Sequence, residues 1–269
     1  MKSIKNFKQS ISNGDELNDL LVYDSDEVNQ ISRQKEICKW ITNRIDDIKT
    51  AAILYCQSKK YGVLPYPKSY NQCRYGDHRG SYKKAIAEKQ IARGLFLLYN
   101  GKNIRLVHEL HSTVDIGCFE DYETPIFHTK YKGRGRNVDI ISVKRGPNEK
   151  IYLHELKKNG SDETLLRCIM EAYTYSIMMD RPKLRHDFGL TSKSKIVICP
   201  MFFRTSQPYI DFTNLHNGKY SELGNLIKLI KERDAEVDIE FAILDADTLK
   251  GIMPKDSTGK SFKTKWLNM

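Results

Sequence analysis

Residues 136–160 read "RNVDIISVKRGPNEKIYLHELKKNG" and combine strand-like apolar segments with charged residues. Two short segments rich in Ile, Val and Leu flank the polar sequence KRGPNE, a pattern that is typical of two strands joined by a turn. Asp139 lies in the first segment, and Glu155 and Lys157 lie in the second. Charged side chains in mid-strand weaken a sheet unless they face water or take part in chemistry.

The alternation of side chains in a strand places Glu155 and Lys157 on one face, with His154 and Leu156 on the other. A hairpin would bring the Asp139 carboxylate close to that of Glu155, with the Lys157 ammonium beside them. Two carboxylates that converge repel each other unless a cation lies between them. Because hard oxygen ligands suit Mg²⁺ or Mn²⁺, we expect such an ion here, with the backbone carbonyl of Leu156 as a further ligand.

A divalent ion at this position would lower the pKa of a bound water and offset charge on a phosphate oxygen. The Lys157 ammonium could orient that water or stabilise the transition state. The spacing therefore predicts a phosphodiesterase site. The alternative is that Glu155 and Lys157 form an exposed pair on an edge strand, which would contribute little energy.

The remaining patterns predict helices and short strands in alternation. Apolar residues recur at helical spacing over residues 31–52, as one helix or two. From residue 81 the expected order is helix, three strands, helix, strand, helix, strand. These elements fall at 81–101, 103–120, 137–144, 150–158, 160–180, 193–203, 220–235 and 236–247. Ser161 or Asp162 is the expected N-cap of the helix within 160–180.

This order predicts an α/β fold. Consecutive strands should form a meander, and strands joined by a helix should lie parallel to a neighbour. The result is a mixed sheet with helices on both faces, formed by residues 81–269. Residues 1–80 form a mostly helical N-terminal extension.

The motif resembles that of a known enzyme family. Asp139, fifteen further residues and then Glu155-Leu156-Lys157 resemble the PD-(D/E)XK nuclease superfamily, and the order of elements resembles its αβββαβ, restriction-endonuclease-like core. Val138 stands in place of the motif's proline. The resemblance implies a metal-dependent nuclease, in which Asp139 and Glu155 are ligands of Mg²⁺ or Mn²⁺ and Lys157 orients the attacking water.

Further residues match the family less closely. Glu88 lies on the helix before the first strand, where family members often carry a metal-binding glutamate, although it could equally be a solvated helix residue. Glu171 and Tyr175 have the spacing of a Gln and a Tyr in some exonuclease-like branches, or they could be a helix surface pair. Alternative acids on the first strand are Asp115, Glu120 and Asp121.

Charge favours a nucleic-acid partner, with DNA as the expected substrate. The chain has 44 Lys and Arg against 34 Asp and Glu, a formal net charge of +10. Basic residues concentrate in two stretches, 130–160 and 181–205, and such surfaces attract polyanions. The residues expected to contact phosphates are Lys132, Arg134, Arg136, Arg167 and the segment 181–195.

Several classes are disfavoured by composition. No apolar run approaches the roughly 18 residues of a membrane helix, and the first residues lack the apolar core of a signal peptide, so we expect a cytoplasmic protein without a membrane partner. The six cysteines form no CxxC pair, which argues against a zinc knuckle. Two other functions stay open: a non-catalytic nucleic-acid-binding module or subunit of a defence or repair complex, and an interaction protein whose N-terminal helices form a homodimer.

Overall fold

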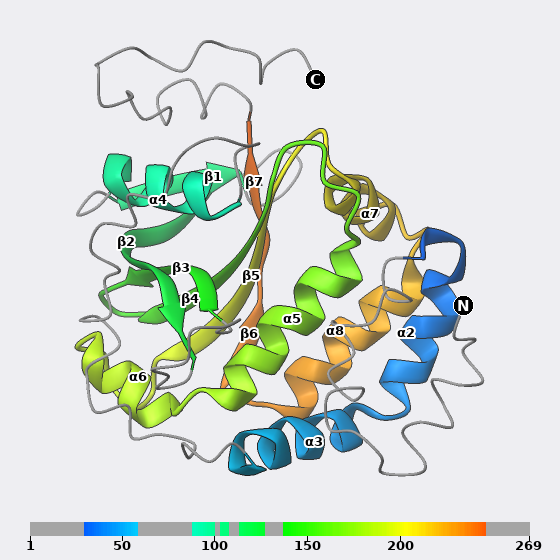
Figure 1. Ribbon diagram of the computed structural model, residues 1–269, viewed down its shortest axis with the longest axis horizontal. Coiled ribbons are helices and arrows are strands. Elements are labelled where there is room, and N and C mark those ends of the chain that lie inside the picture. Colours follow the sequence, from blue (N-terminus) through cyan, green and yellow to red (C-terminus); the bar gives the residue numbers. More distant parts are fainter. Residues whose placement is uncertain (1–29, 59–87, 100–102, 108–112, 127–136, 246–269) are drawn as a thin grey trace.

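The computed structural model describes residues 30–58, 88–99, 103–107, 113–126 and 137–245 (Figure 1). The helical elements are η3 (Ile31–Arg33), α2 (Gln34–Thr42), α3 (Ile45–Ser58), α4 (Glu88–Tyr99), α5 (Leu165–Met178), α6 (Arg181–Asp187), α7 (Gln207–His216) and α8 (Ser221–Arg233). The strands are β1 (Asn103–Val107), β2 (Thr113–Pro125), β3 (Asn137–Lys144), β4 (Lys150–Lys157), β5 (Lys195–Phe203), β6 (Val237–Ile239) and β7 (Ala242–Leu244).

The strands form one mixed sheet. Strands β1 to β4 make an antiparallel meander, whereas β5 lies parallel to β4, and β6 and β7 lie parallel to β5. Strand β7 also pairs with β1, the first strand of the meander, in antiparallel fashion through Ile243 and Val107. The predicted hairpin of 136–160 and the predicted parallel strands are therefore confirmed.

Helices cover both faces of the sheet, so the prediction of an α/β protein with a mixed, helix-flanked sheet is confirmed. Helix α5 lies across β4 and β5, and α2, α3, α7 and α8 gather on the same side (Figure 1). Helix α4 packs against β2, β3 and β4 from the other side. No helix among the described residues is long and apolar enough to cross a bilayer.

The N-terminal helical segment, expected as one helix or two, is two helices. Helix α2 packs on α8, where the Tyr220 hydroxyl donates a 2.7 Å hydrogen bond to Gln34 Oε1. Helix α3 packs on α5. Their apolar side chains belong to the same core as those of α5 and α8, so the described part of the first 80 residues is buried against the sheet's helical layer.

Three predicted elements are wrong in detail. The expected strand 103–120 is two antiparallel strands, β1 and β2, and the expected strand 236–247 is interrupted between β6 and β7. Helices α6 and α7 were not expected, since each is short and lacks a long apolar period. Helix α5 begins later than predicted, because the hydroxyl of Thr164 accepts the capping bond from the Arg167 N–H.

Candidate active site

The sheet register aligns three acidic residues on neighbouring strands. Tyr122 pairs with Ile140 and Ile140 pairs with His154, so Asp139 lies level with Glu123 on β2 and with Glu155 on β4. Leu153, two residues before Glu155, packs in the core under α5. The three carboxylates therefore form a row on the α5 face, at the carboxyl end of β4.

The Asp139 carboxylate is fixed to the neighbouring strand. Its Oδ2 accepts a 2.8 Å hydrogen bond from the N–H of Leu156, between the two charged residues of the motif. Leu156 itself packs under α4, as the alternation predicted. The expected convergence of Asp139 with Glu155 and Lys157 on one face is thus what the hairpin produces.

Lys157 lies at the centre of a carboxylate cluster. Its Nζ lies 2.8 Å from Glu155 Oε1, 3.0 Å from Glu163 Oε2 and 3.5 Å from Glu171 Oε2. Glu155 and Lys157 are only 5% and 3% exposed, and β4 has strands on both sides. The alternative of an exposed pair on an edge strand is therefore wrong.

Helix α5 supplies the next carboxylate. The Tyr175 hydroxyl donates a 2.8 Å hydrogen bond to Glu171 Oε1, which leaves Glu171 Oε2 directed at Lys157. Tyr175 is buried, so the alternative of a helix surface pair is also wrong. One turn of helix separates the two residues, and this spacing lets the tyrosine hold the glutamate in place.

Glu163 was missed because it was assigned to the first turn of α5. The helix begins at Leu165, so Glu163 lies before it and its carboxylate reaches both Lys157 and Arg167. Arg167 Nε lies 3.1 Å from Glu163 Oε2. The predicted phosphate ligand Arg167 is thus engaged by an acid of the cluster.

Glu88 lies beside the same site, at the start of α4. Its Oε1 accepts a 3.2 Å hydrogen bond from the N–H of Lys158, the residue that follows β4. Burial raises the pKa of Glu88, an effect that the nearby Lys157 ammonium partly offsets. The helix before the meander therefore brings this glutamate to the carboxyl end of β4.

Burial and mutual repulsion shift the acid–base behaviour of the cluster. Burial raises the pKa of Asp139 to about 8, and burial together with Glu171 raises the pKa of Glu155 well above its ordinary value. Burial also acts to raise the pKa of Glu171, but the Lys157 ammonium and the Tyr175 hydroxyl outweigh it, and the pKa is lowered. Lys157 is held in its charged form, since its carboxylate partners raise its pKa despite burial.

The donor set fits a hard divalent cation. Asp139, Glu155, Glu163 and Glu171 carry four carboxylates, whereas Lys157 and Arg167 supply two cations, which leaves a formal excess of two negative charges when all are ionised. Across the described ranges, no three His, Cys, Asp or Glu side chains are already arranged around a common point as metal ligands. Glu155, Glu163 and Glu171 instead contact the Lys157 ammonium.

A further acid of the row, Glu123, was not singled out from the sequence. Its Oε2 lies 2.8 Å from Lys89 Nζ and 3.1 Å from Asn137 Nδ2, and its charge acts on Asp139. The acids that were considered on this strand have other partners. Asp115 accepts from the Gly117 N–H, Glu120 pairs with Arg145, and Asp121 accepts from Tyr122 and Thr124.

The predicted phosphate-binding residues are only partly visible. Lys132, Arg134 and Arg136 lie outside the described residues. Within 181–195, ion pairs already engage Arg181 with Asp234 and Glu236, Lys183 with Asp187, and Arg185 with Glu236. Because Arg181, Lys183 and Arg185 are already in ion pairs, they are weaker candidates for phosphate contacts than the basic composition of this segment suggested.

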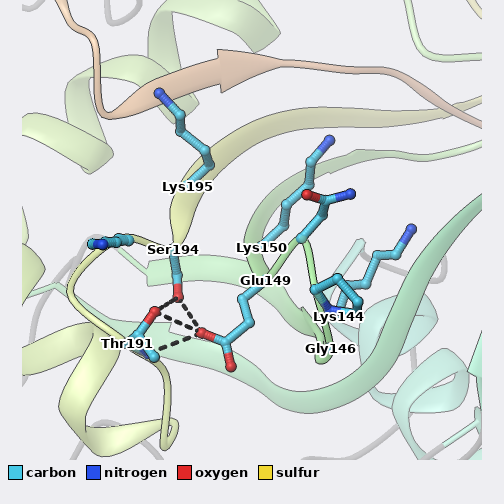
Figure 2. Close-up of a pocket in the computed structure, with 10 residues that line it drawn as sticks. Lys144, Gly146, Glu149, Lys150, Thr191, Ser194 and Lys195 are labelled. Atoms are coloured by element: carbon cyan, nitrogen blue, oxygen red, sulfur yellow. Dashed lines mark hydrogen bonds between the residues drawn. The ribbon is translucent and has the colours of Figure 1, made fainter.

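A basic pocket of about 680 Å³ lies at the other end of β4, about 23 Å away along the strand. Figure 2 shows Glu149 directed at Thr191 and Ser194, whose hydroxyls donate bonds of 2.8 and 2.7 Å to its carboxylate. Among the lining lysines, Lys150 is paired with Glu240 and Lys195 donates to the Ala235 carbonyl. The pocket is thus separate from the carboxylate cluster.

Comparison of the chain with models of protein families, with curated proteins and with solved structures gave no match.

Proposed function

We propose that this protein is a metal-dependent nuclease with the restriction-endonuclease-like fold, and that it hydrolyses phosphodiester bonds of DNA. Support for the fold comes from the order α4, meander β2–β4, α5 and parallel β5, which matches the αβββαβ core that the sequence motif implies. The additional strand β1 lies between α4 and β2.

The observation that carries the proposal is the burial of an ionic cluster at one end of β4. Burying several carboxylates costs free energy unless cations compensate them, and packed apolar side chains at the same positions would give equal or greater stability. Strongly shifted pKa values at converging carboxylates are typical of functional sites. A site in which carboxylates exceed cations can bind a divalent cation. In a protein with a net positive charge, that cation could in turn bind a phosphate group of a nucleic acid.

Each residue has a role in this proposal. Asp139 and Glu155 would hold Mg²⁺ or Mn²⁺, with Glu88 at the rim, and the ion would supply a water of lowered pKa and charge for the phosphate. Lys157 orients the attacking water and stabilises negative charge on the phosphate. Glu171, held by Tyr175, keeps Lys157 protonated and in position.

Cleavage assays with purified variants test the proposal. Linear duplex, single-stranded DNA and RNA are incubated with Mg²⁺, with Mn²⁺ or with EDTA. Wild type should cut DNA only with a divalent ion, and Glu155→Gln or Lys157→Ala should lower the rate at least about 10²-fold. The matched control is Lys150→Met, because Lys150 is at the opposite end of the same strand and should cut like wild type.

Two results would count against the proposal. Equal cleavage by wild type and both cluster variants would mean that the activity lies elsewhere. Binding of DNA by folded wild type without cleavage, and without heat of Mn²⁺ binding in calorimetry, would favour the non-catalytic nucleic-acid-binding module.

A further inference from the structure

Glu123 is a buried carboxylate with one uncommitted oxygen. Its side chain is 9% exposed. Lys89 and Asn137 both bind Oε2, whereas the buried Oε1 has no hydrogen-bond partner within the part of the chain that the structure describes. A carboxylate oxygen left unpaired in this way costs about 1–3 kcal/mol or more, so it calls for an explanation.

The neighbouring acid on the same strand shows that this is not a general property of β2. Asp121 is also buried, but its Oδ1 accepts a 2.9 Å bond from the Tyr122 N–H and its Oδ2 a 3.0 Å bond from the Thr124 hydroxyl. Both oxygens of Asp121 are therefore satisfied by the strand itself. Of these two acids of β2, Glu123 is the one with an oxygen that lacks a hydrogen-bond partner.

Glu123 also adds to the unfavourable charge at Asp139. It lies level with Asp139 on the next strand, and its charge disfavours ionisation of the Asp139 carboxyl. Lys89 offsets this only in part, because its ammonium binds Oε2 and its side chain is 67% exposed. The two carboxyl groups thus lie side by side on neighbouring strands.

We propose that Glu123 Oε1 is a ligand of a divalent cation shared with Asp139, which makes Glu123 a member of the metal centre. This inference rests on the proposed function. The bonds from Lys89 and Asn137 fix the carboxylate through Oε2 and leave Oε1 for the ion, as hydrogen-bonded outer partners do for ligating carboxylates. The ligand row would then run over three adjacent strands, from Glu123 through Asp139 to Glu155.

Mn²⁺ titration followed by electron paramagnetic resonance, in which free Mn²⁺ is counted, tests the proposal on the full chain. Glu123→Gln should weaken Mn²⁺ binding at least about tenfold. Glu120→Gln is the matched control on the same strand, since Glu120 pairs with Arg145 at the surface and should leave Mn²⁺ affinity unchanged. Lys89→Met keeps the Glu123 carboxylate, so it should change the affinity less than Glu123→Gln does.

Thermal unfolding shows whether Glu123 binds the metal ion or only stabilises the fold. Without metal, Glu123→Gln should melt at or above the wild-type temperature, because a buried charge next to Asp139 is removed, and the melting shift that Mn²⁺ gives the wild type should shrink. Glu123→Asn is the second variant, since asparagine tolerates the positive φ of 52° at this position.

The outcomes distinguish this inference from the proposed function. If wild type binds no Mn²⁺, the metal centre itself is wrong. If wild type binds Mn²⁺ and both folded Glu123 variants bind it equally well, the metal centre stands and the role of Glu123 is refuted.

Discussion

Strand β4 is buried on both faces, but the polar residue on one face is neutral whereas those on the other face form ion pairs. Under α4, His154 is held neutral, since burial lowers its pKa to about 3. Its Nε2 lies 2.8 Å from the Ser142 hydroxyl, which donates to the Ile116 carbonyl, so the imidazole donates to Ser142. Under α5, Glu155 and Lys157 form a compact ion cluster instead.

The difference separates a neutral, hydrogen-bonded polar group from a buried ionic cluster. On the α4 face, His154 is neutral and its Nε2 is hydrogen-bonded to Ser142, so no charge is buried there. On the α5 face the carboxylates exceed the cations that contact them, which lowers stability unless a further cation binds. Buried carboxylates with strongly shifted pKa values are typical of functional sites, which is why the proposed function places the chemistry on this face.

The largest expected effect comes from removing the central cation. Lys157→Met leaves Glu155, Glu163 and Glu171 buried around an apolar group, so the free energy of unfolding should fall by about 3–5 kcal/mol at pH 8. Urea unfolding measures the loss. Lys150→Met is the control at the far end of β4, and equal losses in the two variants would remove the distinction between the ends of the strand.

Because burial lowers the pKa of His154, we expect the free energy of unfolding to depend on pH. His154 has a folded pKa of about 3 against an ordinary value of 6.5, so below pH 6.5 the unfolded chain takes up a proton that the folded chain excludes. The stabilisation is complete above pH 6.5 and is lost as the pH falls, by about 3 kcal/mol at pH 4.5.

The variant His154→Leu isolates this effect from the other titrating groups. Urea unfolding of wild type and variant between pH 7.5 and 4.5 should give curves that converge or cross as the pH falls, because only wild type loses the His154 contribution. Parallel curves would show that His154 can be protonated within the folded protein.

A smaller effect is expected from the partner of that histidine. Ser142→Ala leaves the His154 N–H and the Ile116 carbonyl without their bonds, which should cost about 1–2 kcal/mol. Mn²⁺ affinity and DNA cleavage should stay at the wild-type level in the folded fraction. A loss of cleavage that exceeds the loss of folded protein would mean that the two faces of β4 are coupled.

The sequence predicts the centre of the site because strand alternation and a short hairpin are local. Asp139, Glu155 and Lys157 lie within 19 residues, and their relative placement needs only the period of a strand and the KRGPNE turn. Glu171 and Tyr175 are likewise one helical turn apart. Local rules were therefore sufficient to place Asp139, Glu155 and Lys157 together, whereas for Glu171 and Tyr175 they gave the spacing and left open whether the pair is buried.

Glu123 could not be placed in this way. The register between β2 and β3 shifts between Phe119 and Asp121, so Phe119 packs under α4 whereas Asp121 and Glu123 lie level with the α5 face of β3. Strict alternation would have put Glu123 on the Phe119 face. A bulge of one residue reverses every later side chain, and the sequence does not mark it.

The most direct test of the metal centre is a crystal structure of the wild-type protein grown with Mn²⁺, with an anomalous difference map at the manganese absorption edge. We expect a peak bound by Asp139 and Glu155, with Glu123 in contact and the Lys157 ammonium displaced from Glu155. A well-ordered site without an anomalous peak at saturating Mn²⁺, and with Lys157 still bound to Glu155, would contradict it.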